Sequence, residues 1–162
     1  MMKIKVDRLA IFDNIYIIMD KIEFTLHGSF YPHNEIRNFV AEVCKRLGYN
    51  SKTVYEIKTA TDEAFTNVVQ HAHKHKEGKI KIKLVSDPKK ITISVKDWGE
   101  PFKATSLKSR SPHDLVHTKK EGGLGVLLMA RLMDRIRYVR RKTHNELIMV
   151  KYRKEKTNAT KH

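Results

Sequence analysis

The sequence predicts an α/β fold, specifically a two-layer α/β sandwich in which the helices cover one face of a mixed sheet. The apolar pattern switches along the chain between a period of 2, which is typical of strands, and a period of 3.6, which is typical of helices. The elements follow in the order β-α-α-β-β-loop-α-β-β. At 162 residues, without a repeat or a linker, the chain is expected to fold as one domain with its own core.

The first half of the chain predicts one strand and two helices. The segment DKIEFTLHG alternates as a strand does, and HNEIRNFVAEVCKRLG has helical spacing that ends at Gly48, a common C-terminal stop. Asn50, with Ser51 or Thr53, can cap a second helix that runs to about residue 75. The apolar positions of this second helix form one buried face: Val54, Ile57, Ala60, Ala64, Phe65, Val68 and Val69.

The second half predicts a hairpin, a long loop, a helix and two further strands. KIKIKL and ITISVKD alternate on either side of a short turn at 87–90, which is a strong hairpin signal. Residues 101–122 show no clear period and contain two prolines, and a loop of this length is usually functional or disordered. Helical spacing resumes in LGVLLMARLMD, and strands follow near 135–141 and 145–152.

The formal net charge of +15 comes mostly from the last third of the chain, since residues 101–162 carry 16 basic and 5 acidic side chains. The run RIRYVRRK at 135–142 alternates, so a solvated strand face explains it, and residues 153–162 form a basic C-terminal tail. A nucleic-acid partner is the alternative explanation of this charge. The sequence contains no aromatic platform for single strands and no zinc module, so nucleic acid is not the partner that we expect.

Composition favours a cytoplasmic protein. The single cysteine, Cys44, lies in a helical pattern, so no intrachain disulfide can form and the thiol is expected to be a small buried hydrophobe. No apolar run approaches the roughly 20 residues that cross a bilayer, and the N-terminus does not have the order of a signal peptide. Along the chain, we expect an N-terminal extension at 1–19, a domain at 20–152 and then the basic tail.

A stripe of polar residues marks the second predicted helix. Glu63, Asn67 and His71 are each four residues apart, so they lie along one side, beside the apolar face. A carboxylate, an amide and an imidazole aligned in this way offer a general base, an oxygen ligand for Mg²⁺ and a further polar contact. Taken alone, the stripe is also what a solvated helix carries.

A second group of residues lies where the strand ITISVKD ends. Asp97 can accept a hydrogen bond from an exocyclic amine such as that of adenine. Gly99 lets the backbone approach a flat ring closely. The alternative is an Asp-x-Gly turn with Trp98 packed in the core.

A third group, EGGLG at 121–125, leads directly into an apolar helix. Its three glycines, Gly122, Gly123 and Gly125, favour a backbone that bends sharply or approaches another group closely. Unpaired N–H groups at the start of a helix bind phosphate. A plain loop-to-helix turn remains the alternative, since the sequence has neither the Lys-Ser/Thr end of a Walker loop nor a Rossmann strand before the glycines.

Together these three groups resemble, in order and spacing, the N, G1 and G2 boxes of the GHKL ATPases. IKTATDEAFTNVVQHAH is similar to the N box, VKDWGEPF to the G1 box, and EGGLGVLLMARLMD to the G2 box of the small bacterial anti-sigma-factor serine kinases. The resemblance covers residues 20–152 and implies the Bergerat, or histidine-kinase-like, ATPase fold. It also implies that ATP and Mg²⁺ are the cofactors.

The resemblance implies a role for each motif residue. Glu63 would be the general base that activates the attacking hydroxyl, Asn67 would hold Mg²⁺ between the phosphates, and Asp97 would bind the adenine amine. Residues 101–122 would be the nucleotide lid. The remaining ATP-binding positions would be His71, Ala72, Gly99, Pro101, Phe102, Gly122, Gly123, Leu124, Gly125 and Val126.

Some positions depart from the family pattern. Some relatives carry an arginine before the G2 glycines that contacts the terminal phosphate, and Gly122 stands there in this chain. A threonine of the late strand corresponds to Asn145, which can still donate a hydrogen bond. His71 and His75 lie one turn apart, but the neighbouring lysines oppose a transition-metal site. Basic residues of the lid could replace the arginine: Lys103, Lys108, Arg110, Lys119 or Lys120.

The function that the resemblance implies is that of an ATP-dependent protein serine/threonine kinase. Such a kinase would phosphorylate a small antagonist protein and, in its other state, bind a sigma factor; the related kinases are often dimers. Three alternatives stay open: a non-catalytic ATP-gated protein-binding module, the catalytic domain of a split histidine kinase, and a nucleic-acid-binding protein that uses the basic last third. Affinity that falls steeply with salt and ignores ATP would mark the last of these.

Overall fold

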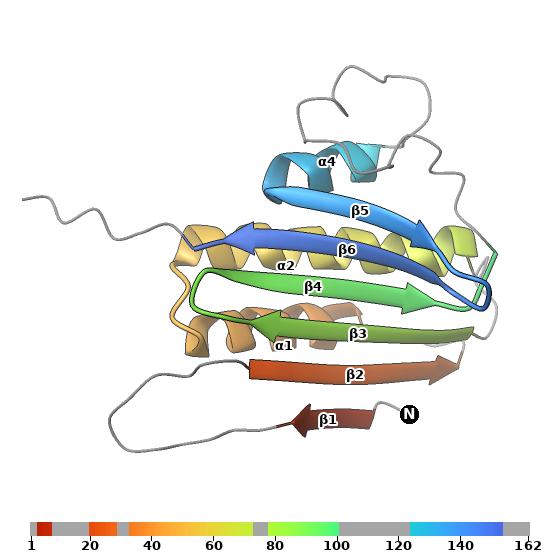
Figure 1. Ribbon diagram of the computed structural model, residues 1–162, viewed down its shortest axis with the longest axis horizontal. Coiled ribbons are helices and arrows are strands. Elements are labelled where there is room, and N and C mark those ends of the chain that lie inside the picture. The colour runs from red at the N-terminus through yellow and green to blue at the C-terminus, as the bar shows by residue number, and fades with distance from the viewer. Residues whose placement is uncertain (1–2, 8–19, 29–32, 73–77, 101–123, 154–162) are drawn as a thin grey trace, which may run out of the picture.

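The computed structural model describes residues 3–7, 20–28, 33–72, 78–100 and 124–153. The strands form one six-stranded sheet in the order β1-β2-β3-β4-β6-β5, and Figure 1 shows α1 and α2 behind one face of this sheet. The two-layer α/β sandwich is therefore confirmed. The elements are β1 (Lys3–Asp7), β2 (Asp20–Gly28), α1 (His33–Arg46), α2 (Ser51–Asn67), the π-helical segment η1 (Val68–Ala72), β3 (Gly78–Ser86), β4 (Lys90–Asp97), α4 (Leu124–Leu132), β5 (Arg135–Arg140) and β6 (Asn145–Tyr152).

Every pair of neighbouring strands in the described ranges is antiparallel, so the prediction of a mixed sheet is wrong. Two successive helices, α1 and α2, connect β2 to β3, and β3 runs in the direction opposite to β2. β4 and β5 do run parallel, since both are antiparallel to β6, yet β6 lies between them and pairs with each. Strand order, which no local pattern encodes, therefore makes the sheet antiparallel.

β1 is a strand that the sequence pattern does not predict. It falls within residues 1–19 and pairs with β2 in the register Lys3↔Thr25 to Asp7↔Lys21. KIKVD contains only two apolar residues among its five, too few to distinguish an edge strand from a solvated segment. Pairing with β2 gives this short strand its place at the edge of the sheet.

The helix ends and the hairpin turn follow the predicted chemistry. Gly48 has a φ of 78°, the left-handed conformation that ends α1 and that glycine adopts without strain. Asn50 is the N-cap of α2, since its Oδ1 accepts a hydrogen bond from Thr53 N at 2.9 Å. In the hairpin between β3 and β4, Asp87 N donates to Lys90 O at 2.9 Å. These predictions are confirmed.

One hydrophobic core joins the helices to the sheet. Inward-facing residues of β3 and β4, such as Ile82 and Ile93, are fully buried under α1 and α2. Cys44 also belongs to this core, and burial raises the pKa of its thiol to about 12. The prediction that Cys44 is a small buried hydrophobe is confirmed. Among the helices of the described ranges, none is both long and apolar enough to cross a membrane.

Candidate functional site

The C-terminal half of α2 presents two polar side chains that are one turn apart. Glu63 and Asn67 are partly buried, and neither has a hydrogen bond or ion pair with another residue of the described ranges. Neither polar head is among the fully buried side-chain atoms that lack a partner, so both are accessible to solvent or to a ligand. His71 and Ala72 follow in η1, a widened helical turn of a kind often found at functional sites. Their side chains lie outside the described part.

Gly125 brings the start of α4 against Glu63. A Cβ atom at position 125 would lie 2.9 Å from Cγ of Glu63 and would overlap its carboxylate. Glycine at this position therefore leaves room for the flexible Glu63 side chain beside the start of α4. Val126, a predicted ATP-binding position, is only 3% exposed and anchors α4 in the core together with Met129. Leu124 begins the helix and is 84% exposed.

Asp97 is buried at the end of β4 and organises the turn that follows. Its Oδ1 accepts hydrogen bonds from Gly99 N at 2.9 Å and from Asn145 Nδ2 at 3.0 Å. Asn145 Nδ2 also lies 3.2 Å from Gly99 O, and the two side chains come from paired positions of β4 and β6. The predicted hydrogen-bond donor at Asn145 therefore binds Asp97, and both residues hold the backbone of Gly99 in place.

The Asp-x-Gly turn of the alternative interpretation is present, but Trp98 does not pack in the core, so that part of it is wrong. The indole is 39% exposed. The Nζ of Lys79 lies 4.4 Å from the ring centroid, and the ring of His144 lies 5.7 Å away at a tilt of 37°. A cation above an aromatic face is stabilised by the ring quadrupole. Trp98 therefore leaves the side of the turn that Asp97 occupies and packs on the opposite face of the sheet.

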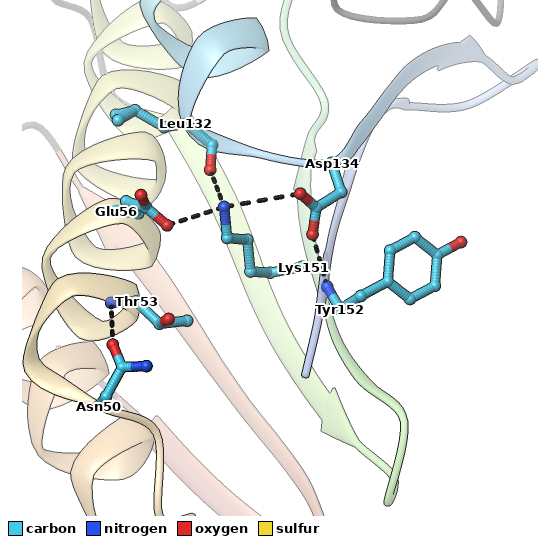
Figure 2. Close-up of polar contacts among 7 residues, drawn as sticks. All are labelled: Asn50, Thr53, Glu56, Leu132, Asp134, Lys151 and Tyr152. Atoms are coloured by element: carbon cyan, nitrogen blue, oxygen red, sulfur yellow. Dashed lines mark hydrogen bonds and ion pairs between the residues drawn. The ribbon is translucent and has the colours of Figure 1, made fainter. Parts of the chain in front are cut away.

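Lys151 fixes the other end of α4 (Figure 2). Its Nζ lies 2.7 Å from Glu56 Oε2 in α2, donates to Leu132 O at 2.7 Å, and lies 3.6 Å from Asp134 Oδ1. Tyr152 N donates to Asp134 Oδ2 at 2.7 Å. These contacts join α2, the end of α4 and β6. Because Gly125 meets Glu63 while Leu132 lies near Glu56, α4 runs antiparallel to α2.

The role of Lys151 is one that the sequence motifs do not reveal. The signal is its phase: NELIMVKY alternates, and Lys151 falls on the same face as Leu147 and Met149. A lysine in the inward phase of an otherwise apolar strand requires a buried partner. Four of the predicted ATP-binding residues lie outside the described ranges: Pro101, Phe102, Gly122 and Gly123. The basic lid residues also lie outside them.

The described site residues gather at one end of the molecule. Figure 1 shows the C-terminal ends of α2 and β4 and the N-terminal end of α4 on the same side of the sandwich. A carboxylate and an amide on α2 therefore lie near a helix N-terminus, and a buried aspartate closes a strand end nearby. Unpaired N–H groups at a helix start favour anions, and an amide oxygen is a ligand for Mg²⁺. The arrangement has the chemistry of a nucleotide site.

An antiparallel sandwich with a polar helix facing a glycine-led helix is the arrangement expected of a histidine-kinase-like ATPase domain. The family model described as histidine kinase-like ATPase domain matches residues 33–151. The chain belongs to this family, and the resemblance to the GHKL ATPases is confirmed.

Named relatives of the chain include serine-protein kinases. The serine-protein kinase RsbW of Bacillus subtilis (strain 168) is 36% identical over 107 residues, which cover 63% of this chain and 67% of that protein. RsbW of Bacillus mycoides (strain KBAB4) is 36% identical over 140 residues, which cover 82% and 85%. The solved SiaB-SiaC complex from Pseudomonas aeruginosa matches with a TM-score of 0.56 at 15% identity, covering 78% of this chain and 87% of that chain. This structural likeness shows a shared fold.

Proposed function

We propose that the chain is an ATP-dependent protein serine/threonine kinase that phosphorylates a small antagonist protein and regulates a sigma factor. The observation that carries the proposal is the contact between α2 and α4, in which the carboxylate of Glu63, without a partner among the described residues, faces Gly125. Relatives that are 36% identical and named serine-protein kinases support the reaction class. Fold alone would not, since one fold serves many functions.

The residues present fit ATP and Mg²⁺. The glycine at position 125 keeps a Cβ atom out of the space beside Glu63. Asn67, one turn further along α2, would supply an amide oxygen to Mg²⁺, and the N–H groups at the start of α4 would hold the phosphates. Asp97, held by Gly99 N and Asn145 Nδ2, would accept a hydrogen bond from the adenine amine.

In this proposal Glu63 acts as the general base. Bound ATP supplies the phosphoryl group, and Mg²⁺ neutralises its charge. The acceptor serine or threonine hydroxyl would lose its proton to the Glu63 carboxylate as its oxygen takes the phosphoryl group, and ADP would leave. A base needs a free lone pair, and Glu63 has no described partner that would occupy it. Asn67 would hold Mg²⁺ against the phosphates. A basic residue of 101–122 would replace the arginine of some relatives, because Gly122 stands at that position in this chain.

The same proposal includes the partners. The bound nucleotide would decide between two of them, the antagonist that receives phosphate and the sigma factor that is held in the other state. Two copies of the chain would form the working unit. The cytoplasm is the compartment in which such partners meet.

Transfer of labelled phosphate tests the proposal. We expect the full chain, incubated with γ-labelled ATP, Mg²⁺ and candidate antagonist domains, to label one antagonist on serine or threonine, and chelation of Mg²⁺ to abolish the labelling. Binding of ATP without transfer to the cognate antagonist would instead identify a non-catalytic ATP-gated module. Gly122 in place of the arginine is the feature that favours this second candidate.

A further inference from the structure

The face of the sheet opposite the helices carries a regular pattern of basic residues. Strand alternation places the inward residues of β3 under the helices and its lysines on the other face: Lys79, Lys81 and Lys83. On β5 the same alternation turns Arg135 and Arg137 outward, and both are exposed. Figure 1 views this face, and no element of the described ranges covers it. We call it the open face.

Two apolar residues of β6 form a short strip between the two basic strands, and the outward residues of β4 beside it are polar. Ile148 and Val150 of β6 point to the open face and are partly buried. Strand register sets Lys83 opposite Ser94, Ser94 opposite Ile148, and Ile148 opposite Arg137. Lysines therefore line one side of the strip and arginines the other. Three strand spacings of about 4.8 Å separate β3 from β5, a width of about 14 Å.

The one acidic residue among the described outward positions of β3 to β6 is already satisfied within the chain. Glu146 Oε1 accepts a hydrogen bond from Ser94 Oγ at 2.5 Å and lies 3.4 Å from Lys96 Nζ. Burial alone would raise the pKa of Glu146, but the hydrogen bond from Ser94 and the charge of Lys96 lower it below the usual value. The carboxylate therefore stays ionised, and basic residues outnumber acidic ones at the outward positions of β3 to β6. On β2, Glu23 lies opposite Lys83.

We infer that the open face binds an acidic amphipathic helix of a partner protein. A helix with its side chains is about 10–12 Å wide, which fits the distance between the two basic strands. The eight residues of β6 span about 26 Å, the length of an 18-residue helix. An apolar stripe on that helix would cover Ile148 and Val150, and acidic flanks would meet lysines on one side and arginines on the other.

Two other occupants fit the open face less well. A second copy of this chain, placed face to face, would bring the same basic strands together, because a two-fold interface pairs identical patches. A nucleic acid would satisfy the positive charge but would offer its phosphates, and not an apolar stripe, to Ile148 and Val150. Charge and apolarity together therefore favour the acidic helix.

A synthetic probe tests the inference with the full chain. The probe is a fluorescein-labelled 18-residue peptide with leucine at helical spacing and glutamate on both flanks, and binding is followed by fluorescence anisotropy. We expect Ile148→Asp and Arg137→Glu each to weaken binding about tenfold, since apolar anchors and charge reversal act at the centre and rim of an interface. Lys52→Glu on α2 is the matched control and is expected to bind as the wild type does.

Several outcomes would overturn the inference. They are absence of peptide binding by the wild type, an equal loss in Lys52→Glu, and equal affinity for a peptide in which lysine replaces every glutamate. Tighter binding of an oligothymidine than of the peptide would assign the face to nucleic acid. A wild-type dimer that Ile148→Asp converts to a monomer, with peptide affinity unchanged, would assign it to a second copy. Because Arg137 is exposed, Arg137→Glu keeps the test valid if Ile148→Asp unfolds.

Discussion

Two glutamates of α2 show how the same type of side chain can have different roles at two positions of one helix. Glu56 and Glu63 are seven residues, about two helical turns, apart, and both face α4. Glu56 lies 2.7 Å from Lys151, so its charge is neutralised inside the protein. Glu63 has no partner among the described residues and faces a glycine. The difference indicates that the first carboxylate holds the helices together, while the second is kept for a ligand.

The largest expected effect separates the two glutamates by activity. Glu63→Gln removes the proposed base and is expected to slow phosphate transfer by about 10²- to 10⁴-fold while ATP binding persists. Glu56→Gln, measured beside it in the same assay, is expected to transfer phosphate at nearly the wild-type rate per folded molecule. Equal rates for Glu63→Gln and the wild type would remove Glu63 from the mechanism.

The next effect separates them by stability. Lys151→Met leaves Glu56 and Asp134 without their cation, and we expect it to lower the free energy of unfolding by about 3 kcal/mol, as breaking a buried ion pair does. Urea unfolding followed by circular dichroism measures this loss. Glu63→Gln is the control and should leave the unfolding midpoint nearly unchanged. If Lys151→Met were as stable as the wild type, the contacts of Lys151 drawn in Figure 2 would not contribute to stability.

A smaller effect is expected at the glycine that faces Glu63. Gly125→Ala places a methyl group where the Glu63 carboxylate lies and forces that flexible side chain to move. We expect transfer to fall about tenfold, because a misplaced base loses part of its catalytic effect. The double variant Gly125→Ala, Glu63→Gln should be no slower than Glu63→Gln alone. Additive losses would show that the methyl group acts on something other than the carboxylate.

The smallest effect concerns Glu146, a third glutamate and one that is paired on the open face. Its pKa is lowered, so its pairing adds stability above the ordinary carboxyl pKa of 4.5 and this stability is lost as the pH falls through the folded-state pKa. Glu146→Gln is expected to cost about 1 kcal/mol or less at pH 7. Unfolding measured at pH 7 and pH 3 should show this difference shrinking on acidification. A difference that grows instead would contradict the assigned direction.

The parts of the site that local chemistry determines could be predicted from the sequence. Spacing placed Glu63 and Asn67 one turn apart, and a glycine cluster before an apolar helix indicated a close approach that Gly125 makes. The cap at Asn50 and the hairpin turn at 87–90 also follow from residues that lie next to each other. In each case, a side chain and its backbone partner are at most a few positions apart.

The features that escaped prediction depend on strand order. Lys151 and Glu56 are 95 positions apart, and only the packing of β6 under α2 brings them together. The all-antiparallel sheet requires β6 to lie between β4 and β5. The alternation of the basic run at 135–142 does predict exposed arginines, and Arg135 and Arg137 are exposed. Their place across the sheet from Lys83 could not be predicted, because it exists only in the register of four strands.

Calorimetric titration with ATP and Mg²⁺ tests the central claim most directly. Asp97→Asn keeps an oxygen for Gly99 N and Asn145 Nδ2 but puts an amide donor in place of the second carboxylate oxygen. We predict that the wild type and Glu56→Gln bind ATP alike and that Asp97→Asn binds it about 10- to 100-fold more weakly, as expected for a lost hydrogen bond to a charged group. Absence of ATP binding by the wild type, or equal affinity in Asp97→Asn, would contradict the assignment of this site to the nucleotide.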